Sequence, residues 1–179
     1  MKSLIGFFLF FLITLSGVNK VFAISPDIFI QSTVNRASEV LSKNVSKEEK
    51  MNQLKIIAKE TVDIRGVGFY SLGSKRKNLD KNQLDIYSVL FENYFLKSFS
   101  SRLAEYTNPE IEVKNKEILN KNYTIVRSVL VATAERPEVK IDWRVYTKDQ
   151  KNPLIRDLII EGLSLARTQK EEFRSILNS

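Results

Sequence analysis

The spacing of apolar residues divides this chain into a helical first part and a strand-rich second part. From residue 26 to residue 106, apolar side chains recur every three or four positions, which is typical of helices with one buried face. One such stripe predicts a helix over residues 26–44. A second helix is predicted to begin after Ser46, where Glu49 completes a capping pattern, and residues 62–73 predict a short helical segment that ends at Gly73.

The next stripe predicts the longest helix and contains many aromatic residues. Asp80 and Gln83 have the spacing of an N-terminal capping pair. The stripe continues for about 25 residues, which is close to 38 Å of helix at 1.5 Å per residue. It consists of Leu84, Tyr87, Phe91, Tyr94, Phe95, Phe99, Leu103 and Tyr106. These side chains either belong to an ordinary core or form the wall of a cavity, and the spacing fits both interpretations.

After residue 109 the pattern changes to short runs rich in Val, Ile, Tyr and Thr, which are typical of strands. They cover residues 111–119, 123–134, 139–147 and 154–161, and a last helix follows over residues 165–177. In the third run apolar and polar residues alternate, which predicts one buried and one solvated face. This order predicts an α+β fold in which a helical layer packs on a curved antiparallel sheet of about four strands. The long aromatic helix is expected to cover one face of that sheet.

The N-terminus has the three-part pattern of a secretory signal peptide. Lys2 supplies the positive charge, residues 4–18 are almost entirely apolar, and residues 21–23 end in the small residue Ala23. A membrane anchor is the alternative, but the apolar run is shorter than the roughly 20 residues that a membrane span prefers. We therefore expect cleavage after Ala23, export, and a single domain over residues 24–179, a length suited to one core.

The composition excludes most catalytic machinery. The chain contains no Cys and no His, so disulfides, Ser-His nucleophile pairs and most zinc sites are excluded. Its net charge of +7 becomes +5 when Lys2 and Lys20 are removed with the signal peptide. This charge is spread along the chain except at residues 75–77, and an exported protein is not expected to bind nucleic acid. The basic surface is either simply solvated or attracts anionic headgroups or an acidic partner.

Two carboxylates near the last strand are the remaining candidates for chemistry. Asp157 and Glu161 would lie on one face of a strand, with their backbones about 13 Å apart. A glycosidase pair needs roughly 5–9.5 Å between its carboxyl groups, so a hydrolase would need a third carboxylate from elsewhere. Gly162 and Ser164 are better explained as a sharp turn and the cap of the last helix. We expect no enzyme activity, no metal and no cofactor.

Three stretches resemble one known family. Residues 62–106 ("VDIRGVGFYSLGSKRKNLDKNQLDIYSVLFENYFLKSFSSRLAEY"), residues 139–146 ("VKIDWRVY") and residues 160–173 ("IEGLSLARTQKEEF") are similar in order and spacing to the MlaC/toluene-tolerance family of periplasmic phospholipid-binding proteins. The chain departs from the family's pattern at Pro153, Arg156, Lys170 and Glu172. The resemblance implies an apolar cavity between helices and sheet that holds acyl chains, with a bound phospholipid as cargo.

The same resemblance implies a shuttle between an outer-membrane lipoprotein complex and an inner-membrane ABC transporter complex, which maintains the lipid asymmetry of the outer membrane. The alternatives are a carrier of another lipid, such as a hopanoid, and a non-carrier interaction module of the same fold. Lys75, Arg76 and Lys77 are candidates for headgroup or docking contacts. The candidate lining residues are Val67, Tyr70, Leu90, Phe91, Tyr94, Phe95, Val129, Val131, Trp143, Val145 and Ile159.

Overall fold

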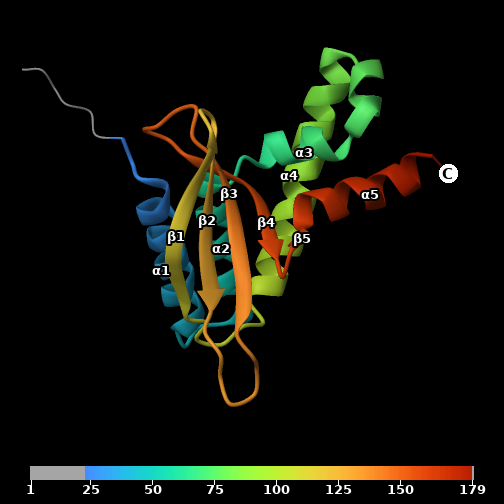
Figure 1. Cartoon of the computed structure of the whole chain (residues 1–179). Helices are drawn as coiled ribbons and strands as arrows, with labels where there is room; N and C mark the ends of the chain where they lie inside the picture. The colour runs from blue at the N-terminus through green and yellow to red at the C-terminus, as the bar shows by residue number, and fades with distance from the viewer. Residues whose placement is uncertain (1–22, 179) are drawn as a thin grey trace, which may run out of the picture.

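The computed structural model describes residues 23–178, so the predicted signal peptide lies, except for Ala23, outside the described residues. The helices are α1 (Pro26–Ser42), α2 (Lys47–Thr61), α3 (Ile64–Ser71), the 3-10 helix η1 (Gly73–Asn78), α4 (Lys81–Leu103) and α5 (Leu165–Leu177). The strands are β1 (Ile111–Asn120), β2 (Tyr123–Leu130), β3 (Val139–Tyr146), β4 (Leu154–Ile160) and β5 (Leu163–Ser164). Helices thus precede an antiparallel sheet and one helix closes the chain, which confirms the predicted α+β fold (Figure 1). Within residues 23–178, none of the helices combines the length and the apolar character that a membrane span requires.

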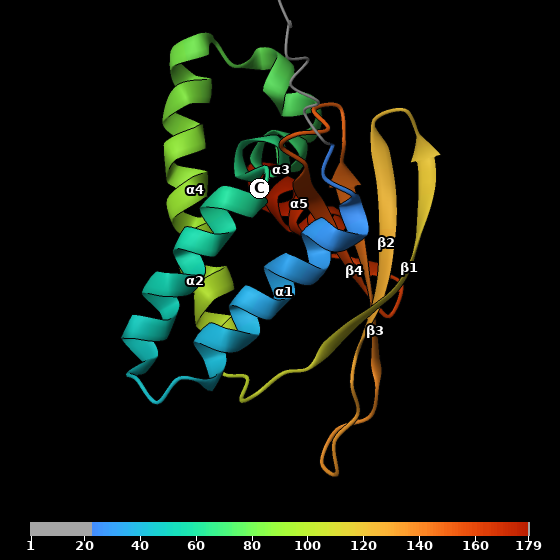
Figure 2. The same ribbon diagram turned by 90° about the vertical axis from the view of Figure 1, so that its left-hand side faces the viewer.

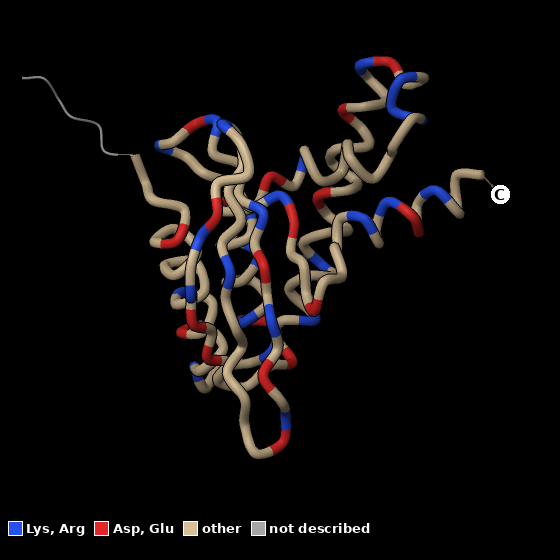
Figure 3. The backbone as a smooth tube through the Cα atoms, viewed as in Figure 1, with Lys and Arg blue, Asp and Glu red and all other residues tan. Residues whose placement is uncertain are grey.

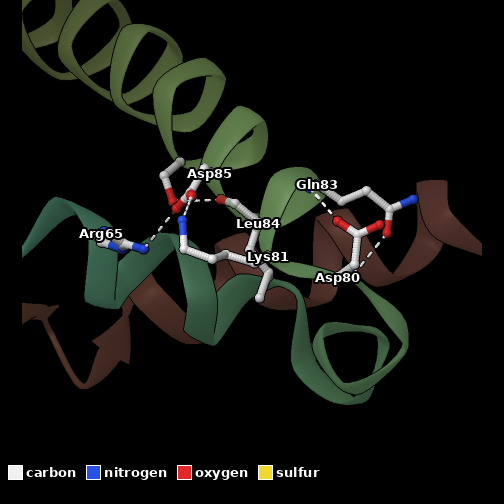
Figure 4. A network of polar contacts seen from close by, with 7 residues as sticks. Arg65, Asp80, Lys81, Gln83, Leu84 and Asp85 are labelled. Carbon is white, nitrogen blue, oxygen red and sulfur yellow. Dashed lines mark hydrogen bonds and ion pairs between the residues drawn. The ribbon is translucent and has the colours of Figure 1, made fainter.

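Side-chain caps set where the helices begin. The Ser46 side chain accepts a hydrogen bond from the Glu49 N–H, and Ser164 does the same for the Arg167 N–H at α5. At α4 the capping box is complete, because Asp80 accepts from the Gln83 N–H while Gln83 accepts from the Asp80 N–H (Figure 4). Each cap satisfies backbone donors that have no partner inside the helix. The predicted helix starts are confirmed at these three positions.

The sheet is an open antiparallel meander in the order β1-β2-β3-β4-β5. The four long strands were predicted, and the two-residue β5 is an addition that pairs with the end of β4. In β3 the side chains of Ile141, Trp143 and Val145 are buried on one face, as their alternation predicts. The pairing of β3 with β4 shifts register after Arg144, so that Arg156 is an extra residue in β4. This bulge decides which face of the sheet the later residues of β4 occupy.

Helix α1, and not α4, packs directly on the sheet. Ile30 and Val34 of α1 share a buried cluster with Val126 and Trp143 of the strands. The Gln31 side chain fixes α1 along β1 by bonding backbone groups of that strand. Helix α4 packs instead on α2 and α3, on the side away from the strands (Figure 2). The expectation that the long helix covers the sheet is therefore corrected, because α1 reaches the sheet first and α4 faces it only across the space between the layers.

Helices α3 and α4 approach each other unusually closely. A Cβ atom added to Gly68 of α3 would lie 2.7 Å from a ring carbon of Phe91 in α4, closer than real Cβ contacts. Arg65 of α3 also pairs with Asp85 of α4, which Lys81 contacts as well (Figure 4). The hydrogen bond from Lys81 lowers the pKa of Asp85. These ion pairs are exposed and contribute little to stability. The close packing of α3 against α4 therefore depends mainly on Gly68 having no side chain.

The free edge of β4 is covered by other backbone and by helix ends. Asp63, just before α3, donates its N–H to the Ile155 carbonyl oxygen at 2.9 Å. On the outer side, Asp157 is only 5% exposed and accepts hydrogen bonds from the Ser164 hydroxyl and the Ala166 N–H at 2.7 and 3.0 Å. Gly162 makes the turn between them with a positive φ of 83°, which a residue with a side chain rarely adopts.

Candidate functional site

An apolar cavity of about 140 Å³ lies between the helices and the sheet. Its walls come from both layers, with α1 and α2 on one side and β2, β3 and β4 on the other, and the C-terminal half of α4 closes it. The lining is almost entirely aliphatic and aromatic, and includes Val34, Ala37, Leu41, Leu54, Ile57, Phe99, Leu103, Leu130, Trp143 and Leu158. We call this space the first cavity. Its chemistry suits an aliphatic chain and offers little to a polar ligand.

A second cavity of about 190 Å³ lies beside the first. It is bounded by α3, α4, α5 and the edge of β4, and its apolar wall includes Val67, Phe91, Tyr94, Phe95 and Leu165. Polar side chains are found around it as well, including Arg102, Gln169 and Glu172. Four residues line both cavities and form the partition between them: Val62, Phe99, Ile155 and Leu158. The two cavities are therefore neighbours separated by side chains alone.

The wall contributed by α4 is a ladder of aromatic rings. Phe91, Phe95 and Phe99 follow one another at four-residue intervals, which places them on the same side of a helix. The ring centroids of Phe91 and Phe95 are 6.2 Å apart and those of Phe95 and Phe99 are 5.4 Å apart, both stacked. Phe173 of α5 meets Phe91 edge-on at 6.0 Å. The ladder runs from the second cavity to the partition and ties α4 to α5.

The sequence-predicted lining residues divide into two groups in the structure. Val67, Phe91, Tyr94 and Phe95 lie together around the second cavity, and Trp143 lines the first. Tyr70 lines, with Val67, a further pocket that is described below. The structure therefore brings together the residues of α3 and of the inner side of α4.

The other predicted lining residues lie elsewhere. Leu90 is 63% exposed on a different side of α4, and Val145 is fully buried in the cluster between α1 and the sheet. Val129 pairs with Lys140, and Ile159 pairs with Asp142, so both lie on the outer face of the sheet. Val131 follows the end of β2, where its N–H bonds the Glu110 carbonyl oxygen. For Val129 and Ile159 the physical reason is that alternate strand residues face opposite sides, and the bulge at Arg156 sets the side on which Ile159 lies.

Several lining residues were not predicted from the sequence. Thr33, Ala37 and Leu41 of α1 and Leu54 and Ile57 of α2 contribute much of the first cavity. Their helical stripes are visible in the sequence, but a stripe that lines a cavity has the same spacing as one that fills a core.

A pocket of about 390 Å³, lined by both apolar and charged residues, adjoins the second cavity near the edge of β4. It is lined by Gly66, Val67, Tyr70, Leu119, Asn120, Tyr123, Arg144, Arg156, Asp157 and Ala166, and we call it the arginine pocket. Val67, Arg156, Asp157 and Ala166 line the second cavity as well. The lining therefore gains charged side chains where it passes the edge of β4 to the outer face of the sheet, the face on which Arg144 lies.

Arg156 has its partners within the protein. Its Nε donates to Asp63 and its Nη1 donates to the Tyr123 hydroxyl, both at 2.6 Å, and its guanidinium lies 3.8 Å from the centroid of the Tyr146 ring. Burial opposes the charged form, but the hydrogen bonds to Tyr123 and Asp63 outweigh it and raise the pKa of Arg156. Arg156 therefore fastens the start of α3 to β4 and β2.

The carboxylates considered for catalysis have structural partners. Asp157 is bonded to the turn and the start of α5, as described above, and Glu161 accepts a hydrogen bond from the Lys140 N–H of the neighbouring strand at 2.5 Å. Ser164 caps α5. Within residues 23–178 there is no group of three or more acidic side chains placed to hold a metal ion. Residues 156–166 therefore join the last strand to the last helix.

The basic residues Lys75, Arg76 and Lys77 lie in η1, between α3 and α4, where Figure 3 shows a stretch of positive charge. All three are exposed, and the Arg76 guanidinium lies 4.4 Å from the centroid of the Phe69 ring. None of the three lines the two apolar cavities or the arginine pocket.

A family model described as "MlaC protein" matches residues 31–179, which is most of the chain. The chain belongs to the MlaC family. Among solved structures, this MlaC-family chain is similar to a phospholipid-binding protein from Ralstonia solanacearum determined in complex with a phospholipid. The two share 15% sequence identity with a TM-score of 0.73, and the match covers 87% of this chain and 88% of the other. At that identity the likeness shows a shared fold. A search of curated protein sequences gives no significant match.

Proposed function

We propose that this MlaC-family protein binds a phospholipid between its helical layer and its sheet and carries it across the periplasm. The observation that carries the proposal is the pair of adjoining apolar cavities, whose walls come from both layers of the fold. Membership of the MlaC family and the likeness to a protein determined with a bound phospholipid support it. In this role the protein carries lipid between an outer-membrane lipoprotein complex and an inner-membrane ABC transporter complex.

The energetics explain why such a carrier needs no reactive group. Each methylene group left in water costs about 0.8 kcal/mol, so two acyl chains with roughly 30 methylene groups cost more than 20 kcal/mol. An apolar cavity offsets this cost by burial alone. The role is therefore non-catalytic, and the lipid is cargo.

The cavities must widen to hold a whole phospholipid. A methylene group occupies about as much space as a water molecule, roughly 30 Å³. Cavities of about 140 and 190 Å³ therefore hold on the order of ten methylene groups. Movement of α4 away from the sheet would provide the remaining volume. Helix α4 packs on α2 and α3, and its residue Phe99 lies in the partition, so this movement would also join the two cavities.

The test is to purify the protein from cells that contain phospholipid and to analyse solvent extracts by mass spectrometry. We expect close to one phospholipid per protein. Tyr94→Glu places a charge at the second cavity, and should reduce the lipid recovered while the protein stays folded, because Tyr94 is 43% exposed and the charge can reach water. Val89→Glu is the matched control, since Val89 lies in the same helix and is 62% exposed. A folded sample without lipid would refute the carrier and favour an interaction module, and recovery of a hopanoid would change the cargo.

A further inference from the structure

We propose that the arginine pocket binds the phosphate group of the lipid through Arg144. This inference deepens the proposed function and rests on it, since it assigns one end of the cargo to a defined site. The first observation is position, because the arginine pocket shares Val67, Arg156, Asp157 and Ala166 with the second cavity. A pocket that holds charged side chains and adjoins an apolar cavity suits a molecule with a charged head and apolar chains.

Arg144 is the cation of this pocket whose N–H donors lack hydrogen-bond acceptors within the described residues. Its Nε is buried and has no hydrogen-bond acceptor among the described residues of the chain. Its Nη1 lies 3.8 Å from the nearest Asp157 oxygen, which is too far for a hydrogen bond. The oxygens of Asp157 are bonded by the Ser164 hydroxyl and the Ala166 N–H instead. Because a buried donor without an acceptor is costly, this Nε favours an acceptor supplied from outside the chain.

The other cation of the pocket, Arg156, is already paired, and this singles out Arg144. Arg156 is engaged by Asp63 and Tyr123, so its position is fixed and its charge is largely balanced by Asp63. Arg144 is 42% exposed in its side chain, so its guanidinium can reach a ligand that enters from solvent. A guanidinium presents several donors in one plane and matches the oxygens of a phosphate group. Lys75, Arg76 and Lys77 lie elsewhere on the surface, in η1, and do not line this pocket.

The shared chemistry is a phosphate group, which a lipid headgroup or free phosphate can supply, and the experiment separates the two. The purified protein is incubated with vesicles containing equal amounts of dioleoylphosphatidylglycerol and dioleoylglycerol, re-isolated, and analysed by mass spectrometry. The two lipids have the same chains and differ in the phosphate-bearing headgroup. We expect the protein to prefer the phospholipid, and Arg144→Gln to reduce this preference by about tenfold or more, since charged hydrogen bonds are lost.

Two further variants make the result interpretable. Arg127→Gln removes a cation from the same face of the sheet, where Arg127 pairs with Glu117 outside the arginine pocket, and should leave the preference unchanged. Arg144→Lys keeps the charge without the planar donors and should give an intermediate preference. Circular dichroism checks that each variant is folded, and if Arg144→Gln does not fold, Arg144→Lys carries the test.

The outcomes separate the two proposals. An unchanged preference in folded Arg144→Gln and Arg144→Lys would overturn the phosphate site while leaving the carrier intact. Failure of the wild-type protein to retain either lipid would instead contradict the carrier. A large excess of inorganic phosphate should lower the preference for the phospholipid. If phosphate protects the wild-type protein against unfolding but leaves the lipid preference unaltered, the pocket binds free phosphate and the lipid assignment fails.

Discussion

Replacement of Gly68 by Ala tests the close approach of α3 and α4, which positions one wall of the second cavity. The added Cβ atom would lie 2.7 and 2.9 Å from two ring carbons of Phe91. Carbon atoms prefer a separation of about 3.5–4.0 Å, so one contact is roughly 0.8 Å too short. The ring cannot turn away easily, because Phe91 is only 3% exposed and Tyr87, Phe95 and Phe173 pack around it.

The expected magnitude follows from two opposing effects. Overpacking of a buried site costs about 1–3 kcal/mol. The gain from replacing a helical glycine by alanine is at most about 1 kcal/mol. Gly68→Ala should therefore lower the free energy of unfolding by about 1–2 kcal/mol. Urea denaturation followed by circular dichroism measures this difference.

A double-mutant cycle identifies the cause. Phe91→Leu removes the ring that the new Cβ atom meets, so adding Gly68→Ala to it should cost about 1 kcal/mol less than adding it to the wild-type protein. Asn93→Ala, at an exposed position of α4, gauges the gain from helix propensity alone. If Gly68→Ala is neutral or stabilising, or if Phe91→Leu does not reduce its cost, the close contact between α3 and α4 does not exist as described.

Three other outcomes are expected from single side chains. Trp143 is the only tryptophan and lines the first cavity, so phospholipids with brominated chains should quench its fluorescence, and unquenched emission in a loaded sample would place the chains elsewhere. Arg156→Gln should lower the free energy of unfolding by about 1–3 kcal/mol in a denaturant titration, because it leaves the half-buried Asp63 without its charged partner, and an unchanged midpoint would refute that role. Hydrogen bonds from Lys116 and Ser25 lower the pKa of Asp27 from 3.8 to about 2, so its stabilising effect should be complete above pH 4 and lost as the pH falls towards 2. Asp27→Asn should therefore lower the melting temperature at pH 7 but not at pH 2, and an equal effect at both would contradict this sign.

The sequence was sufficient for the elements that depend on local chemistry. Asp80 with Gln83 and Ser164 marked helix starts that the structure confirms, since a cap involves residues only three positions apart. The alternation in β3 also predicted which of its side chains are buried, because β3 has a polar and an apolar face.

The features that the sequence did not predict depend on contacts between distant residues. Ile159 lies between two other apolar residues of β4, so its face is set by the bulge at Arg156 and not by alternation. Leu90 and Phe91 are adjacent and both apolar, but one is exposed and the other is buried against α3. Helix α4 is apolar on more than one side, so its spacing alone could not show that α1 packs on the sheet while α4 packs on α2 and α3.

The ends of the sheet have a consequence for solubility. If the helical layer moves to admit lipid, the outer strands become the places where a second molecule could add a strand and begin aggregation. On one side, two register shifts interrupt β1, and the charged Glu112 and Lys114 lie at the first of them. On the other side, β4 already has its backbone bonded by Asp63 and by β5. Because β1 is irregular and the backbone of β4 is already hydrogen-bonded, the helical layer could move away from the sheet without exposing a strand edge that pairs with another copy of the protein.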